Sequence, residues 1–107
     1  MSEVFHLVLP SAWQANPDEP YRAASLDTER FIHCSYAEQV AASANRFYAA
    51  ADELLVLCID PEKLSSPVKA EPASSGELFP HVYGPINRNA VTSVRALARD
   101  AAGKWVF

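Results

Sequence analysis

The sequence predicts a single α+β domain that spans residues 1–107, with a small sheet and one main helix. Short apolar runs, which are typical of strands, outnumber the segments with helical periodicity. A chain of 107 residues with 50% hydrophobic and 21% charged side chains has the size and composition of one globular domain. The helix must pack on the strands, because its apolar face has no other partner.

The first half of the chain contains three runs that we expect to form strands, at residues 4–9, 31–34 and 54–59. The third run has no polar alternation, which indicates a central strand covered on both faces. A brief helix carrying Trp13 is expected after the first run, with Ser11 as its cap.

The strongest helical pattern covers residues 36–51. Ser35 and Glu38 have the spacing of a capping box at its start. Apolar side chains then recur at intervals of three and four residues and give the helix one apolar face. These residues are Val40, Ala44, Phe47, Tyr48 and Ala51.

The second half reads less regularly. Residues 68–71 are expected to form an edge strand, and residues 78–86 a shaped loop or broken strand, because two prolines and a glycine interrupt them. Residues 90–99 fit a helix or a strand. Because Val91, Thr92 and Val94 favour a strand, we expect a C-terminal hairpin with residues 104–107.

The composition argues against several classes of partner. With 9 basic and 13 acidic residues, the net charge of −4 gives no electrostatic footprint for duplex DNA or an anionic membrane. Two cysteines are too few for a disulfide framework, the first residues lack the basic region of a signal peptide, and no apolar run approaches the roughly 20 residues that span a bilayer. We expect a cytoplasmic monomer.

The three histidines, His6, His33 and His81, all lie between apolar neighbours. An imidazole in such a place can donate, accept, titrate near neutrality or bind a metal, although each histidine also fits a purely structural role. Their separations of 27 and 48 residues match no compact metal motif, so no metal site is expected.

His33 precedes the start of the expected helix. Free amides at that end would suit a phosphate or carboxylate, and Ser35 either contributes to this site or only caps the helix. Cys34 should face the opposite side of the strand from His33, which argues against a cysteine–histidine dyad between these neighbours.

Further candidate site residues surround these histidines. His81 and Tyr83 are two residues apart and face one way in an extended segment, as a rigid pocket wall or a packed turn. Arg22 and Ser25 follow a proline-rich loop and could contact an anion, although a solvated arginine fits equally. Glu71, at a strand end, is the candidate catalytic acid, with a surface role as the alternative.

Taken together, several motifs resemble one bacterial family, the domain of unknown function 952, over nearly the whole chain. Arg30 departs from the family pattern, since it stands where the family usually has glycine, and this suggests a local backbone difference. The motifs that carry the resemblance are Phe5-His6, Trp13, Tyr21 to Leu26, Phe31-Ile32-His33-Cys34-Ser35, Gln39-Val40 and Phe79-Pro80-His81-Val82-Tyr83-Gly84-Pro85.

The resemblance implies a fold similar to the ADP-ribosyltransferase superfamily, a split α+β half-barrel whose cleft holds NAD in its enzymes. In that comparison His6 looks like the histidine that holds a ribose, and Glu71 is a candidate for the glutamate that polarises it. The related RNA 2′-phosphotransferases cluster histidines and arginines, which is similar to His6, Arg22, His33 and His81.

These observations give two main hypotheses. In the first, the protein binds or processes NAD, ADP-ribose or another phosphorylated nucleotide as a transferase-like enzyme, with catalysis assigned to Glu71 and His33. Its ligand-binding residues would be His6, Arg22, Ser25, Ser35, His81 and Tyr83. In the second, the domain keeps the fold and binds a ligand or a protein without catalysis. A metal-dependent hydrolase is a third, more distant alternative.

Overall fold

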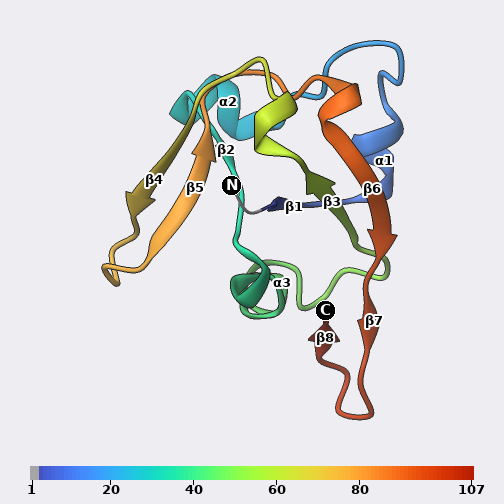
Figure 1. Cartoon of the computed structure of the whole chain (residues 1–107). Helices are drawn as coiled ribbons and strands as arrows, with labels where there is room; N and C mark the ends of the chain where they lie inside the picture. The colour runs from blue at the N-terminus through green and yellow to red at the C-terminus, as the bar shows by residue number, and fades with distance from the viewer. Residues whose placement is uncertain (1–2) are drawn as a thin grey trace.

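The computed structural model describes residues 3–107. Its centre is formed by two three-stranded antiparallel sheets (Figure 1). In the first sheet the order is β1 (Val4–Val8), β3 (Leu55–Ile59) and β6 (Val91–Ala96). In the second it is β2 (Ile32–His33), β5 (Leu78–Val82) and β4 (Val68–Pro72). The predicted α+β class is confirmed; both sheets are antiparallel, and no closed barrel forms among the described residues.

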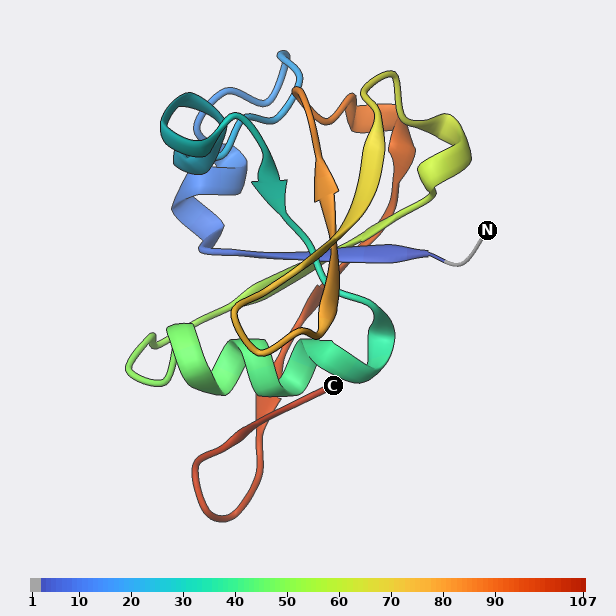
Figure 2. The same cartoon turned by 90° about the vertical axis from the view of Figure 1, so that its left-hand side faces the viewer.

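The helices lie around these sheets (Figure 2). The main helix consists of a 3-10 turn, η1 (Ala37–Gln39), followed directly by α3 (Val40–Phe47). Two short helices, α1 (Pro10–Gln14) and α2 (Ala24–Glu29), lie between β1 and β2 along the chain. The remaining elements are the 3-10 turns η2 (Pro61–Lys63) and η3 (Arg88–Ala90) and the C-terminal hairpin of β7 (Ala98–Arg99) and β8 (Trp105–Val106).

The expected central strand is confirmed, because β3 lies between β1 and β6 and its residues from Val56 to Ile59 are buried. One face of the first sheet packs with Ile32 and Val82 of the second sheet in the main core cluster. Val40 of α3 packs with Phe5 and Val56 in another cluster. The absence of polar alternation in β3 is thus explained by burial on both sides.

The C-terminal hairpin is fixed to α3 by a reciprocal contact of Asn45 with Trp105. The Asn45 side chain donates to the Trp105 carbonyl at 3.0 Å and accepts from its backbone N–H at 2.8 Å. The buried indole also donates to the Tyr48 carbonyl. Strands β6 and β7 occupy most of residues 90–99. The strand interpretation of this segment is confirmed, and the helix alternative is wrong.

Helix starts differ from those expected. The first helix begins at Pro10 after Leu9, without the Ser11 cap. At the main helix, Gln39 rather than Glu38 closes the capping box: its Oε1 accepts from the Tyr36 backbone N–H at 2.9 Å. Ser35 cannot occupy the cap position, because its backbone pairs with Phe5 in both directions.

The two sheets are joined where β1 meets the residues that follow β2. One bridge links Phe5 and Ser35, and beside it the buried His6 side chain contacts the His33 carbonyl through Nδ1 at 2.6 Å. Because a carbonyl only accepts, Nδ1 carries the proton, and Nε2 accepts from the Tyr21 hydroxyl at 2.9 Å. The His6 side chain thus extends the contact between the sheets.

Arg30 ends α2 in a left-handed conformation, with φ 74° and ψ 8°. Its N–H donates to the Leu26 carbonyl, as in a typical C-terminal cap. Glycine adopts this conformation most readily, so the backbone at Arg30 has the form that suits the glycine usual in the family at this position.

No helix among the described residues is long and apolar enough to cross a membrane.

Replacement of Arg30 by glycine should stabilise the fold. Removing the Cβ relieves the left-handed strain, while the more flexible glycine adds entropy to the unfolded chain, so we expect a net gain of about 0.5–1 kcal/mol. Urea unfolding at pH 7 measures this gain. Arg30→Ala is the matched control, because it removes the same long side chain and keeps the Cβ. A similar gain from both variants would contradict the backbone explanation.

Replacement of Gly84 by alanine should destabilise the fold. Gly84 has φ +155°, and a Cβ there would lie 2.3 Å from Ser66 Oγ and 2.9 Å from Ser66 Cβ. We expect a loss of about 1–3 kcal/mol in urea unfolding. Gly76→Ala is the control, since Gly76 also has positive φ but open space around it. The double variant Ser66→Gly, Gly84→Ala should recover part of the loss, and no recovery would show that the clash is not its cause.

The stability of the fold should fall in mild acid because of His6. Burial lowers the pKa of His6 from 6.5 to about 4, so the unfolded chain binds a proton more readily than the folded one. The stabilisation is complete above pH 6.5 and is lost as the pH falls toward 4, by about 3 kcal/mol. Urea unfolding of the wild type between pH 7 and 4 measures this loss, and His6→Asn should lose correspondingly less. Parallel curves for the two proteins would contradict the assignment.

Candidate functional site

Two of the three histidines lie side by side on the outer face of the second sheet. His33 of β2 and His81 of β5 are paired in register, and their ring centroids are 5.4 Å apart in an edge-to-face arrangement. The alternating residues Ile32 and Val82 point into the core and are fully buried. The strand pattern therefore directs both imidazoles away from the core. We call this surface the histidine face; its residues are Glu29, Phe31, His33, Glu71, His81 and Tyr83.

His81 is held by Glu71 of the neighbouring strand β4. His81 Nδ1 donates to Glu71 Oε1 at 2.9 Å, and the Tyr83 hydroxyl donates to the same oxygen in a short hydrogen bond. The bond from Tyr83, with that from His81, lowers the pKa of Glu71, and the bond to Glu71 raises the pKa of Tyr83. Glu71 is thus an ionised acceptor at neutral pH. Since His81 Nδ1 keeps its proton and donates to Glu71, His81 Nε2 is left as an acceptor for another partner.

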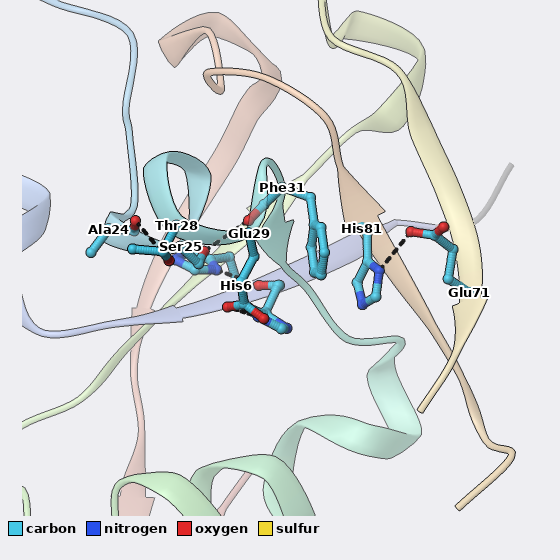
Figure 3. Close-up of polar contacts among 9 residues, drawn as sticks. His6, Ala24, Ser25, Thr28, Glu29, Phe31, Glu71 and His81 are labelled. Atoms are coloured by element: carbon cyan, nitrogen blue, oxygen red, sulfur yellow. Dashed lines mark hydrogen bonds and ion pairs between the residues drawn. The ribbon is translucent and has the colours of Figure 1, made fainter. Parts of the chain in front are cut away.

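Phe31 connects the two histidines. Its ring stacks on His81 with centroids 4.0 Å apart and an interplanar angle of 18°, and it meets His33 at 4.8 Å. Figure 3 shows Phe31 beside His81, with Glu71 on the far side of the imidazole. His33 Nε2 lies 2.9 Å from Glu29 Oε2, so each imidazole of the face has one carboxylate partner. The Glu29 pair is half exposed and adds little to stability.

A cleft of about 340 Å³ opens beside this face, and His33 lines it. Its polar walls also include Arg22 and Ser25, while the buried pair of His6 and Tyr21 forms part of its lining. The Ser25 hydroxyl donates to the Phe31 carbonyl at 2.8 Å, which ties α2 to the segment that carries the face. The other lining residues are Leu7, Val8, Leu9, Ala12, Ala23, Ala24 and Tyr48.

The loop next to the cleft is held by Arg88. Its guanidinium donates to the backbone carbonyls of Trp13, Asn16 and Glu19 and lies over the Trp13 ring at 4.1 Å. Arg22 has a weaker tie, an exposed ion pair with Asp27 at 2.9 Å. Because exposed pairs exchange partners at little cost, the Arg22 guanidinium remains suited to an anionic ligand.

The structure divides the residues proposed from the sequence into three groups. Arg22, Ser25, His33 and His6 line the cleft, although both ring nitrogens of His6 already have internal partners. Glu71, His81 and Tyr83 form one hydrogen-bonded cluster on the histidine face. Ser35 is buried, and its hydroxyl donates to Ser43 at 3.5 Å. The Ser35 hydroxyl therefore already has an internal partner, and the exposed His33 imidazole lies apart from it.

The structure separates Cys34 from His33. Cys34 is buried in the main core cluster, on the opposite face from the exposed His33 side chain as expected, and burial raises its pKa to about 12. Within residues 3–107, no three side chains of histidine, cysteine, aspartate or glutamate come together in a way that could hold a metal ion.

Three residues of the site were not assigned a role from the sequence: Tyr21, Glu29 and Phe31. The four-residue spacing of Glu29 and His33 could have indicated their pair, although a turn and not a helix brings them together. Phe31 belonged to a recognised motif without a stated function. No sequence signal indicates the Tyr21–His6 bond, because it depends on how the loop returns to Ile86 through the Tyr21–Ile86 bridge.

Comparison with known proteins agrees with this architecture. The crystal structure of protein CC0527 from Caulobacter crescentus is similar at a TM-score of 0.84 and 27% identity, covering 98% of this chain and 94% of that one. The solution structure of CC0527 gives a TM-score of 0.80 at 28% identity, with 97% and 91% covered. No curated protein matches the sequence. The model of the family described as protein of unknown function DUF952 matches residues 7–94, and this chain belongs to that family.

Proposed function

We propose that this protein binds a phosphorylated nucleotide-like small molecule, such as NAD or ADP-ribose, across the cleft and the histidine face. The observation that carries the proposal is the place of His33, which lines the cleft and also contacts the rings of Phe31 and His81. One ligand can therefore use both surfaces, and a nucleotide has the anionic and aromatic parts that they suit.

The cleft suits the phosphate or ribose end of such a ligand. Arg22 offers a guanidinium that is held only by an exposed pair, and a guanidinium matches phosphate oxygens in a bidentate arrangement. His33 adds an imidazole at the same wall. The volume of about 340 Å³ falls at the lower end of the range for small-molecule sites.

The histidine face suits the ring end. Phe31, His81 and Tyr83 present aromatic surfaces, on which a base or nicotinamide ring can stack. Two carboxylates, Glu29 and Glu71, border these rings, and this combination favours a cationic ring such as oxidised nicotinamide. Glu71 as an ionised carboxylate is also the group that a transferase of the ADP-ribosyl type would need near developing positive charge.

The proposal predicts which substitutions weaken binding. Titration calorimetry with NAD and ADP-ribose should give saturable binding to the wild type. Arg22→Gln should weaken ADP-ribose binding about tenfold through the lost phosphate contact. Phe31→Leu should weaken binding of NAD more than binding of ribose 5-phosphate, since only NAD carries aromatic rings that can stack on Phe31.

Arg46→Gln is the matched control, because Arg46 lies on α3, contacts the Phe47 ring and does not line the cleft. It should bind as the wild type does. Absence of binding to both nucleotides at millimolar concentration would contradict the proposal, and so would equal affinities for the wild type, Arg22→Gln and Phe31→Leu.

A further inference from the structure

Each histidine of the histidine face has one ring nitrogen engaged and one left over. His33 binds Glu29 through Nε2, and His81 binds Glu71 through Nδ1. Among residues 3–107, His33 Nδ1 and His81 Nε2 have no hydrogen-bond partner. The two rings thus carry one open nitrogen each, and the carboxylates occupy the other positions.

The two imidazoles are close enough to act on one small group. They belong to paired positions of adjacent strands, and their centroids lie 5.4 Å apart. Phe31 touches both rings and limits how far either can turn. His81 is further fixed by Glu71, and its side chain is 13% exposed, whereas that of His33 is 55% exposed. One imidazole is therefore held rigidly and the other is accessible to solvent and ligand.

We propose that His81 and His33 form a general acid–base pair that cleaves ribonucleotide phosphodiesters at the site of the proposed function. This inference rests on that function, because it requires a phosphorylated nucleotide that spans both surfaces, with its scissile phosphate at His33, where the cleft and the histidine face meet. A carboxylate that binds one imidazole nitrogen fixes the tautomer and supports the positive charge that develops on the ring. Glu71 and Glu29 are the positioning residues of the pair.

The reaction needs no cofactor and is balanced by proton transfer alone. His81 Nε2 takes the proton of the ribose 2′-hydroxyl, and the 2′-oxygen forms a bond to the adjacent phosphorus. The bond from phosphorus to the 5′-oxygen of the next nucleoside breaks, and protonated His33 Nδ1 gives its proton to that oxygen. The products are a 2′,3′-cyclic phosphate and a free 5′-hydroxyl. Water then opens the cyclic ester with the two roles exchanged.

The negative net charge of the protein favours substrates with few phosphates, such as dinucleotides, over long RNA chains. A net charge of −4 and two carboxylates beside the face disfavour the phosphates of a long nucleic acid. Among residues 3–107, Arg22 is the one guanidinium that lines the adjoining cleft, and it can neutralise a phosphate there. Dinucleotides and cyclic mononucleotides therefore fit better than RNA chains.

The test uses the full chain with EDTA and the dinucleotide ApA, with products separated by chromatography. Cleavage is expected for ApA but not for dApdA, which lacks the attacking hydroxyl. His33→Ala and His81→Ala should each lower the rate at least about 100-fold. His81→Asn, which keeps a donor toward Glu71, should fold as the wild type does and also lose activity. Glu71→Gln should shift one limb of a bell-shaped pH profile, while Arg46→Gln changes nothing.

The outcomes separate failure of the acid–base pair from failure of the proposed nucleotide binding. ApA that binds in calorimetry without being cleaved overturns the acid–base pair and leaves the proposed binding function intact. Failure of NAD, ADP-ribose and ApA to bind overturns the proposed function as well. Cleavage of dApdA, or cleavage that persists in His33→Ala or His81→Ala, points to a contaminating nuclease and also overturns the pair.

Discussion

The arrangement of both sheets depends on the buried side chain of His6. Its Nδ1 donates to the His33 carbonyl, and its Nε2 accepts from the Tyr21 hydroxyl, so one neutral ring connects β1, the end of β2 and the loop that returns through Tyr21. Only a neutral imidazole can make both bonds in this direction, and burial lowers its pKa accordingly. A family resemblance suggested direct ligand contact for this histidine. Its bonds also make it the residue that fixes the backbone from which the His33 side chain projects.

Strand positions could be predicted because burial leaves a direct trace in the sequence. The run of residues 54–59 has no polar alternation since β3 is covered on both sides, and residues 68–71 read as an edge strand because β4 has a neighbour on one side only. The caps could not be predicted, because Ser35 matches the capping pattern but is taken by backbone pairing with Phe5. A tertiary contact replaced the local one.

The residues of the candidate site could be predicted from the sequence, but the contacts between them could not. That His81 and Tyr83 share a face follows from their spacing of two, and both do contact Glu71. That Glu71 reaches them depends on the register of β4 against β5, in which Glu71 is opposite Phe79 and thus diagonal to His81. No local pattern encodes this register. The same holds for His33 and His81, which become neighbours only through the pairing of β2 with β5.

The attachment of the loop at residues 14–20 has a consequence for how the fold opens locally. Residues 14–20 are exposed and contribute no buried side chain to the core. Arg88 holds this segment through the carbonyls of Asn16 and Glu19, and through that of Trp13 just before it. Opening this loop therefore breaks a few surface hydrogen bonds and leaves both sheets intact. Amide hydrogen exchange is therefore expected to be faster in this segment than in the buried strand β3. Opening of this segment and global unfolding are thus separate events in this fold.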